Sequence, residues 1–113
     1  MTISELRELS VAGFGHRYRL ELLAALAIAP ADQGISLSLL AECCAVTASV
    51  YYPPVQKMTW SGMVVTSGRD RTKRRVLYAR TGARVWTGLR TMVEDLAVDV
   101  DLASAALSWP ATA

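Results

Sequence analysis

Two adjacent prolines, Pro53 and Pro54, stand in a stretch where Val55 and Met58 already show helical spacing. Inside a helix, each proline would remove a backbone donor and cost roughly 3 kcal/mol. In the first turn of a helix this cost disappears, because the amides there lack helical partners and the φ of proline already fits. We therefore predict that a regular helix begins close to Pro53, after an irregular approach over residues 47–52.

The size and composition of the chain predict one globular domain. It has 113 residues, of which 52% are hydrophobic, enough for a core of its own. The longest apolar stretch, residues 22–31, is about half the length of a membrane span, and the acidic N-terminus does not have the pattern of a secretory signal. Cys43 and Cys44 are adjacent and suggest a reducing compartment. We expect a cytoplasmic protein without a membrane partner.

The charge of the chain is unevenly distributed, although its net value is only +2. Residues 57–90 hold nine lysines and arginines against one acid, Asp70, whereas residues 91–113 hold four acids and no base. A basic middle third predicts a face that meets a polyanion. The alternative is a charged surface that is only solvated.

Apolar spacing and turn residues predict the order of the elements. Three helices precede the proline pair, over residues 3–11, 16–29 and 37–45. A very short strand is expected at Ile35. The β-branched run 63–66 and its partner 75–79 predict an antiparallel hairpin around a polar loop. A final helix is expected to run from Thr81 to about residue 107.

The last predicted helix carries an apolar stripe with alternating steps of three and four residues. A repeat of about 3.5 residues is typical of a coiled-coil seam, which requires a partner helix. We therefore expect a homodimer. Its predicted interface includes Trp86, Leu89, Val93, Leu96 and Val100. The alternative is that this helix packs against its own domain.

Successive helices followed by a basic hairpin predict a mainly α fold with a small two-stranded β-wing, a winged helix-turn-helix. In such a fold, the second helix of a pair fits the major groove of DNA, which is about 12 Å wide. The basic hairpin lies along the DNA backbone, where it displaces counterions. We assign residues 1–80 to this DNA-binding domain and residues 81–113 to a long C-terminal dimerisation helix.

Short motifs around the proline pair support this assignment. They are Leu40-Ala41, Val46-Thr47, Tyr52-Pro53 and Gly62-Met63-Val64. In this spacing they resemble the helix-turn-helix of winged-helix bacterial transcription regulators, more narrowly the PadR-like family of the MarR and ArsR-like superfamily. Ala45 stands where the turn usually has glycine, so the turn must either avoid a positive φ or accept strain. The resemblance implies a homodimeric regulator, expected to be a repressor, that binds double-stranded DNA without a cofactor and can respond to a small-molecule effector.

The candidate DNA contacts lie on the helix that begins near Pro53, on its approach and on the wing. The helix and its approach contribute Thr47, Ser49, Tyr51, Tyr52, Gln56 and Lys57. Hydroxyl groups can bond to phosphate, and a glutamine amide can pair with adenine. Each also has a plainer role, as a helix cap, a solvated side chain or, for one of the two tyrosines, a core residue. The wing contributes Arg69, Arg71, Lys73, Arg74 and Arg75, of which alternate residues share a face.

The sequence offers no catalytic arrangement, so we do not expect an enzyme. His16 is the only histidine, and no nucleophile–base set, glycine-rich phosphate loop or paired-carboxylate site can be assembled. We expect Cys43 and Cys44 to be packing residues and no metal to be bound, with a thiol or metal sensor of the ArsR type as an alternative. The other alternative is a winged helix that binds an acidic protein partner.

Overall fold

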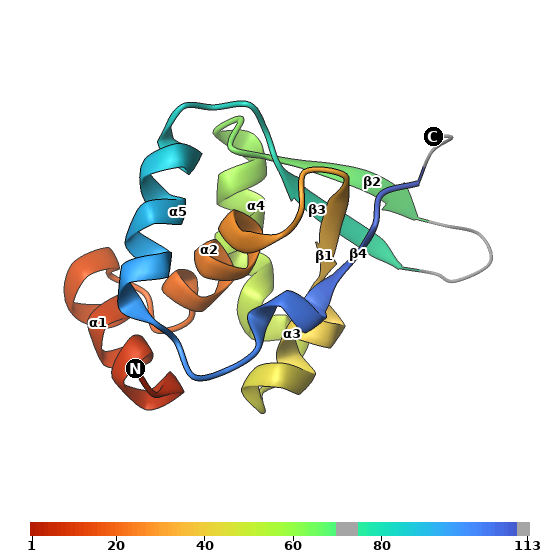
Figure 1. Ribbon diagram of the computed structural model, residues 1–113. Helices are drawn as coiled ribbons and strands as arrows, with labels where there is room; N and C mark the ends of the chain where they lie inside the picture. The colour runs from red at the N-terminus through yellow and green to blue at the C-terminus, as the bar shows by residue number, and fades with distance from the viewer. Residues whose placement is uncertain (70–74, 111–113) are drawn as a thin grey trace.

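The computed structural model describes residues 1–69 and 75–110, with the helices gathered at one side and a hairpin projecting from them (Figure 1). The elements run in the order α1 (Ile3–Phe14), α2 (Arg19–Ile28), β1 (Gln33–Ser36), α3 (Leu37–Cys44), the 3-10 segment η1 (Ala48–Tyr51), α4 (Tyr52–Trp60), β2 (Val64–Arg69), β3 (Val76–Arg80), α5 (Val85–Leu96), the 3-10 segment η2 (Leu102–Ala105) and β4 (Ala106–Ser108).

Helices α1 and α2 confirm the first two predicted helices, and α2 lies at the centre of the core. Residues 20–27 of α2 are all buried, as expected of a helix that packs on every side. Helix α1 continues to Phe14 and ends at Gly15, whose φ of 71° is a common helix-closing conformation. Within the described ranges, no helix, α2 included, is long and apolar enough to cross a membrane.

The strands form one antiparallel sheet in the order β2-β3-β1-β4. Val64 pairs with Arg80 and Thr66 with Tyr78, which confirms the predicted hairpin. Strand β1 contains the short strand expected at Ile35, and Ile35 lies opposite Tyr78 of β3. The two strands of the wing therefore lie at one side of a four-stranded sheet, which is larger than the two-stranded sheet predicted.

The C-terminal region departs from the long helix predicted from residue 81 to about 107. Helix α5 has 12 residues and ends at Leu96, because Ala97 adopts a left-handed φ of 48°. Residues 98–101 alternate valine with aspartate, and both have weak helix propensity. The chain then passes through η2 and adds β4 to the edge of β1 (Figure 1). The predicted long dimerisation helix is thus corrected to a short helix followed by a strand.

The apolar stripe of the predicted seam is divided between the core and the surface. Trp86 and Val93 are 4% and 5% exposed and pack in the core of their own chain. In addition, Trp86 Nε1 donates to the carbonyl of Met63 at 2.8 Å. Neither side chain is available to a partner, so their assignment to a dimer interface is corrected. The other members of the predicted interface are half-buried, namely Leu89, Leu96 and Val100.

The hydrophobic core continues across residue 80, where we placed a domain boundary. Helix α5 packs on α2. Leu102 and Ala105 of η2 are buried in the same cluster as the residues of α2. In the described part of the chain, the segment after residue 80 therefore completes the core of the segment before it.

Candidate nucleic-acid interface

Helices α3 and α4 form a helix-turn-helix whose turn bends at Ala45. Ser36 caps α3, and its hydroxyl accepts a bond from Leu39 N at 3.4 Å. Ala45 has a φ of 56°, a region that costs a residue with a Cβ about 1–2 kcal/mol. Val46 N then donates to the carbonyl of Ala41 at 3.0 Å and closes the end of α3. Of the two alternatives for this turn, the chain accepts strain.

Helix α4 begins where the proline pair predicts. Residues 48–51 form a 3-10 turn and α4 starts at Tyr52, so both prolines lie in its first turn. The side chain of Pro54 is buried, whereas that of Pro53 is exposed. No side chain caps this end of α4, and the prolines remove amide donors that would otherwise need a partner.

The exposed face of α4 carries three of the predicted DNA contacts. Tyr52 is 48% exposed, and Gln56 and Lys57 are exposed as well. Tyr52 and Gln56 are one turn apart and therefore neighbours on the helix surface. Thr47 and Ser49 are exposed in the approach to α4, where their hydroxyls share a hydrogen bond at 3.2 Å. These five side chains are accessible to a ligand.

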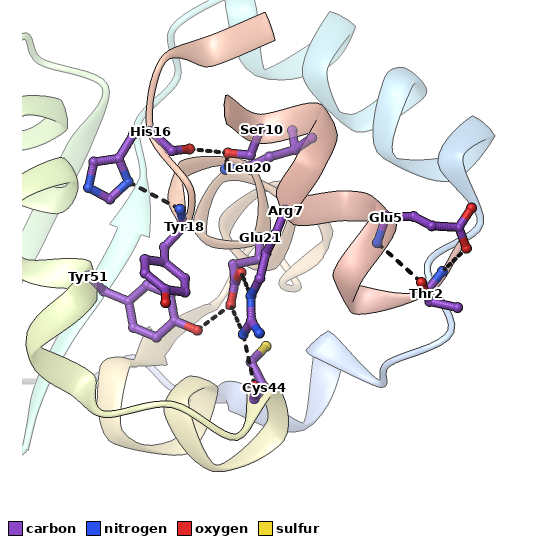
Figure 2. A network of polar contacts seen from close by, with 10 residues as sticks. All are labelled: Thr2, Glu5, Arg7, Ser10, His16, Tyr18, Leu20, Glu21, Cys44 and Tyr51. Carbon is purple, nitrogen blue, oxygen red and sulfur yellow. Dashed lines mark hydrogen bonds and ion pairs between the residues drawn. The ribbon is translucent and has the colours of Figure 1, made fainter. Parts of the chain in front are cut away.

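Tyr51, in contrast, is 0% exposed, and its assignment to the DNA-contacting set is corrected. Its phenol donates to the carboxylate of Glu21 on α2 (Figure 2). Burial, and after it the bond to Glu21, raises the pKa of Tyr51 well above its usual value. The expectation that one of the two tyrosines is a core residue is confirmed.

Two of the five basic residues predicted for the wing fall within the described residues. Arg75 is exposed directly before β3. Arg69 is the last residue of β2, beside an irregularity in the β2–β3 ladder. The other three lie outside the described residues, and these are Arg71, Lys73 and Arg74.

A cleft of about 290 Å³ joins α4, β3 and the start of α3. Tyr52 lines it from α4, Ser38 from α3, and Arg75 and Tyr78 from the β3 side. Burial, and after it the nearby phenol of Tyr52, raises the pKa of Tyr78. The cleft therefore brings together two predicted contacts, Tyr52 and Arg75, and adds polar groups beside them.

Ser38 and Tyr78 also belong to this surface, although the sequence did not predict either of them. Tyr78 reaches the start of α3 because β1 pairs with β3, and Ser36 lies opposite Leu77. Such a pairing joins segments far apart in the chain, so no local pattern predicts it.

A second, mostly apolar cavity of about 450 Å³ lies between α4, α5 and the junction of α1 with α2. Its apolar lining includes Phe14, Leu23, Pro54, Met58, Val85 and Leu89. Arg19 and Lys57 add two cationic groups. The cavity can hold an apolar molecule in direct contact with α4.

The cysteines and the histidine occupy packing positions. Cys44 is buried, and burial is the largest cause that raises its pKa to about 12. Cys43 is half-buried, with its sulfur 2.7 Å from the hydroxyl of Ser104. His16 Nδ1 accepts a bond from the amide of Tyr18 at 3.1 Å. In the part of the chain that the structure describes, no three histidine, cysteine or acidic residues gather into a metal-binding group.

The helix pair, the hairpin and the sheet together make this a winged helix-turn-helix fold. A transcriptional regulator of the MarR family from Rhodococcus sp. RHA1 has a similar solved structure, with a TM-score of 0.53 and 19% sequence identity. The match covers 82% of this chain and 63% of that chain, so the present chain spans less than two thirds of the regulator.

A predicted DNA-binding transcriptional regulator from E. coli also matches, with a TM-score of 0.44 and 17% identity over 79% of this chain and 81% of that chain. No protein family and no curated protein sequence matches the chain. The likeness to the MarR-family structure confirms the winged-helix prediction at the level of the fold. The narrower PadR-like resemblance stays a prediction.

Proposed function

We propose that the protein is a DNA-binding transcription regulator. One observation carries the proposal: Tyr52 of α4 and Arg75 at the base of the wing line the same cleft. A helix that reads a groove and a wing that binds the backbone must share a surface to hold one duplex. The MarR-family neighbour is itself described as a transcriptional regulator, which supports the assignment.

In the proposed complex, α4 enters the major groove. Gln56 has the amide that can pair with adenine, and Tyr52 has a ring that can pack on sugar or on a thymine methyl group. Thr47 and Ser49 donate to phosphates beside the groove, and Lys57 adds positive charge. The wing supplies further charge through Arg69, Arg71, Lys73, Arg74 and Arg75. Each phosphate contact should contribute a slope of about −0.9 to the salt dependence of binding.

We further propose that two copies bind DNA together and repress transcription by occupying the operator. The half-buried side chains of Leu89, Leu96 and Val100 are the part of the predicted seam that a second copy could cover. A twofold axis would place two α4 helices in successive major grooves, about one helical turn apart. The binding site should then be a pseudo-palindrome.

The apolar cavity beside α4 supports the proposal of a small-molecule effector. Its volume of about 450 Å³ lies within the range of roughly 300–1,000 Å³ for ligand pockets. Pro54, Lys57 and Met58 belong to α4 and line the cavity. An effector that binds one orientation of α4 better than another would therefore change the affinity for DNA.

Selection of bound duplexes from a random pool, at moderate salt, tests the proposed function. We expect a recurring pseudo-palindrome and an affinity that falls steeply between low and physiological salt. Weak, sequence-indifferent retention would instead support the alternative of a winged-helix protein-interaction module. For the thiol- or metal-sensor alternative, burial of Cys44 and its raised pKa make this thiol a poor nucleophile and ligand, which counts against Cys44 as the sensing group.

A further inference from the structure

Glu21 is a carboxylate in the most completely buried helix of the described fold. Its side chain is 0% exposed, and Arg7 of α1 holds it through Nε to Oε1 at 2.8 Å and Nη2 to Oε2 at 3.2 Å. Tyr51 also donates to Oε2, so both carboxylate oxygens are bonded (Figure 2). Apolar residues in place of a buried ion pair are often equally stable. Stability alone therefore does not explain this pair.

The same network contacts both sides of the turn between α3 and α4. Arg7 Nη2 donates to the carbonyl of Cys44, the last residue of α3, at 2.8 Å. Tyr51 ends η1 and immediately precedes α4. The ring of Tyr18 contacts both Arg7 and Tyr51: its centroid lies 5.1 Å from the guanidinium carbon of Arg7 and, edge-on, 6.3 Å from the ring centroid of Tyr51. One ion pair between α1 and α2 therefore fixes the end of α3 and the start of α4.

The start of α4 has few other polar anchors. No side chain caps it, and Pro53 and Pro54 have no amide hydrogen to donate. The backbone bond from Val46 N to the carbonyl of Ala41 closes α3 and does not reach α4. The phenol of Tyr51 is therefore the main polar anchor at the start of α4, beside the apolar packing of Val55 and Met58 in the core.

We propose that Glu21 and Arg7 are positioning residues for DNA recognition, and that they set the angle of α4 through Tyr51 and the Cys44 carbonyl. The inference rests on the proposed function, because this angle affects recognition only if α4 enters a groove. A small rotation at the start of the helix displaces Gln56, one turn later, relative to a base edge. Hydrogen bonds weaken steeply as their angles depart from linearity, so such a displacement reduces discrimination between bases.

Two conservative substitutions test the inference, with a third as a control. Tyr51→Phe removes only the hydroxyl group, and Glu21→Gln keeps the shape of the side chain but removes its charge. Val93→Ala truncates a buried residue of α5 that is outside the network, so it lowers stability without touching the turn. All variants are compared with the unchanged protein at a temperature where circular dichroism shows each of them folded.

Two measurements are made on each variant. The first is hydrogen exchange of the amides in residues 46–60, compared with those of α5. The second is the ratio of the affinity for the selected duplex to that for a shuffled duplex. We expect Tyr51→Phe and Glu21→Gln to accelerate exchange in residues 46–60 and to lower the affinity ratio by about tenfold, the effect of one lost base contact. Val93→Ala should leave the affinity ratio unchanged.

An unchanged ratio in both network variants, or an equal loss in Val93→Ala, would overturn the positioning role. If the unchanged protein itself prefers no duplex, the proposed function fails and the role in recognition fails with it. The exchange measurement still decides in that case whether the network fixes α4, because unchanged exchange in residues 46–60 would show that it does not.

Discussion

Ala45 and Ala97 hold the chain in the left-handed backbone region, with φ of 56° and 48°. A Cβ there costs about 1–2 kcal/mol. Glycine would avoid this cost but would lose about 0.5–1 kcal/mol through the greater freedom of the unfolded chain. The strain relief is the larger of the two effects. Ala45 is therefore a strained position of the turn, where glycine would be the more stable residue.

Ala45→Gly is expected to raise the free energy of unfolding by about 0.5–1 kcal/mol, because the relief of strain exceeds the entropic cost. The matched control is Ala12→Gly at an exposed position in α1, which should lower it by a similar amount, about 0.5–1 kcal/mol. Urea unfolding followed by circular dichroism measures both changes. A loss of stability in Ala45→Gly equal to that in Ala12→Gly would contradict the strained turn.

Arg75 and Gln56 are proposed to contact different parts of the DNA, so their loss should have different signatures. Arg75→Ala is expected to weaken binding to all sequences and to reduce the magnitude of the salt slope by about 0.9 per protomer. Gln56→Ala should leave the slope unchanged and relax base preference at one position by about 1–3 kcal/mol. Fluorescence anisotropy over a salt series separates the two. Identical behaviour of both variants would count against the proposed division between base and backbone contacts.

The start of α4 and the end of α5 show which elements local patterns can predict. The proline pair fixes the start of α4 through covalent geometry, which acts on neighbouring residues only. The apolar stripe from Trp86 onward suits a long helix equally well as a short helix followed by core and strand residues. Which of the two structures forms depends on the edge of β1, with which β4 pairs and which lies some seventy residues earlier in the chain. A pattern read along one segment contains no information about that edge.

Gly34 is the point where β1 closely approaches the C-terminal segment. A Cβ there would lie 3.0 Å from Trp109 Cε3 and 3.1 Å from Leu77 Cβ. We expect Gly34→Ala to lower the free energy of unfolding by about 1–3 kcal/mol through overpacking. Gly88→Ala, on an open helical position of α5, should instead raise it by about 0.5–1 kcal/mol. Thermal unfolding compares the pair, and tolerance of Gly34→Ala would argue against the contact with Trp109.

The residue types of the candidate interface could be predicted from the sequence, but their arrangement on one surface could be predicted only in part. The proline pair and the polar side of the predicted helix identified Tyr52, Gln56 and Lys57 as candidates, and all three lie on the exposed face of α4. They could not decide which tyrosine is buried, because that depends on Glu21, which approaches from another helix. The cleft that joins Tyr52 to Arg75 likewise depends on the packing of distant elements.

The association of two copies is the proposal that involves the surface of the complete fold. Leu96 is half-buried near the end of α5, and Leu96→Glu should place a charge in the proposed interface. We expect sedimentation to detect dimers of the unchanged protein and monomers of this variant, with weaker operator binding because two half-sites are no longer bound together. Thr91→Glu, on an exposed position of α5, is the control and should remain dimeric. Monomers in all three proteins would overturn the proposed homodimer.

The return of β4 to β1 also determines which sheet edges can meet another molecule. In the order β2-β3-β1-β4, the outer strands are β2 and β4. Strand β4 has only three residues. The pairing of β2 with β3 is irregular between Thr66 and Arg69, the last residue of β2. Edge strands that are short, bulged or charged are poor templates for the addition of another strand. The edges of the described sheet should therefore resist the addition of strands from other molecules.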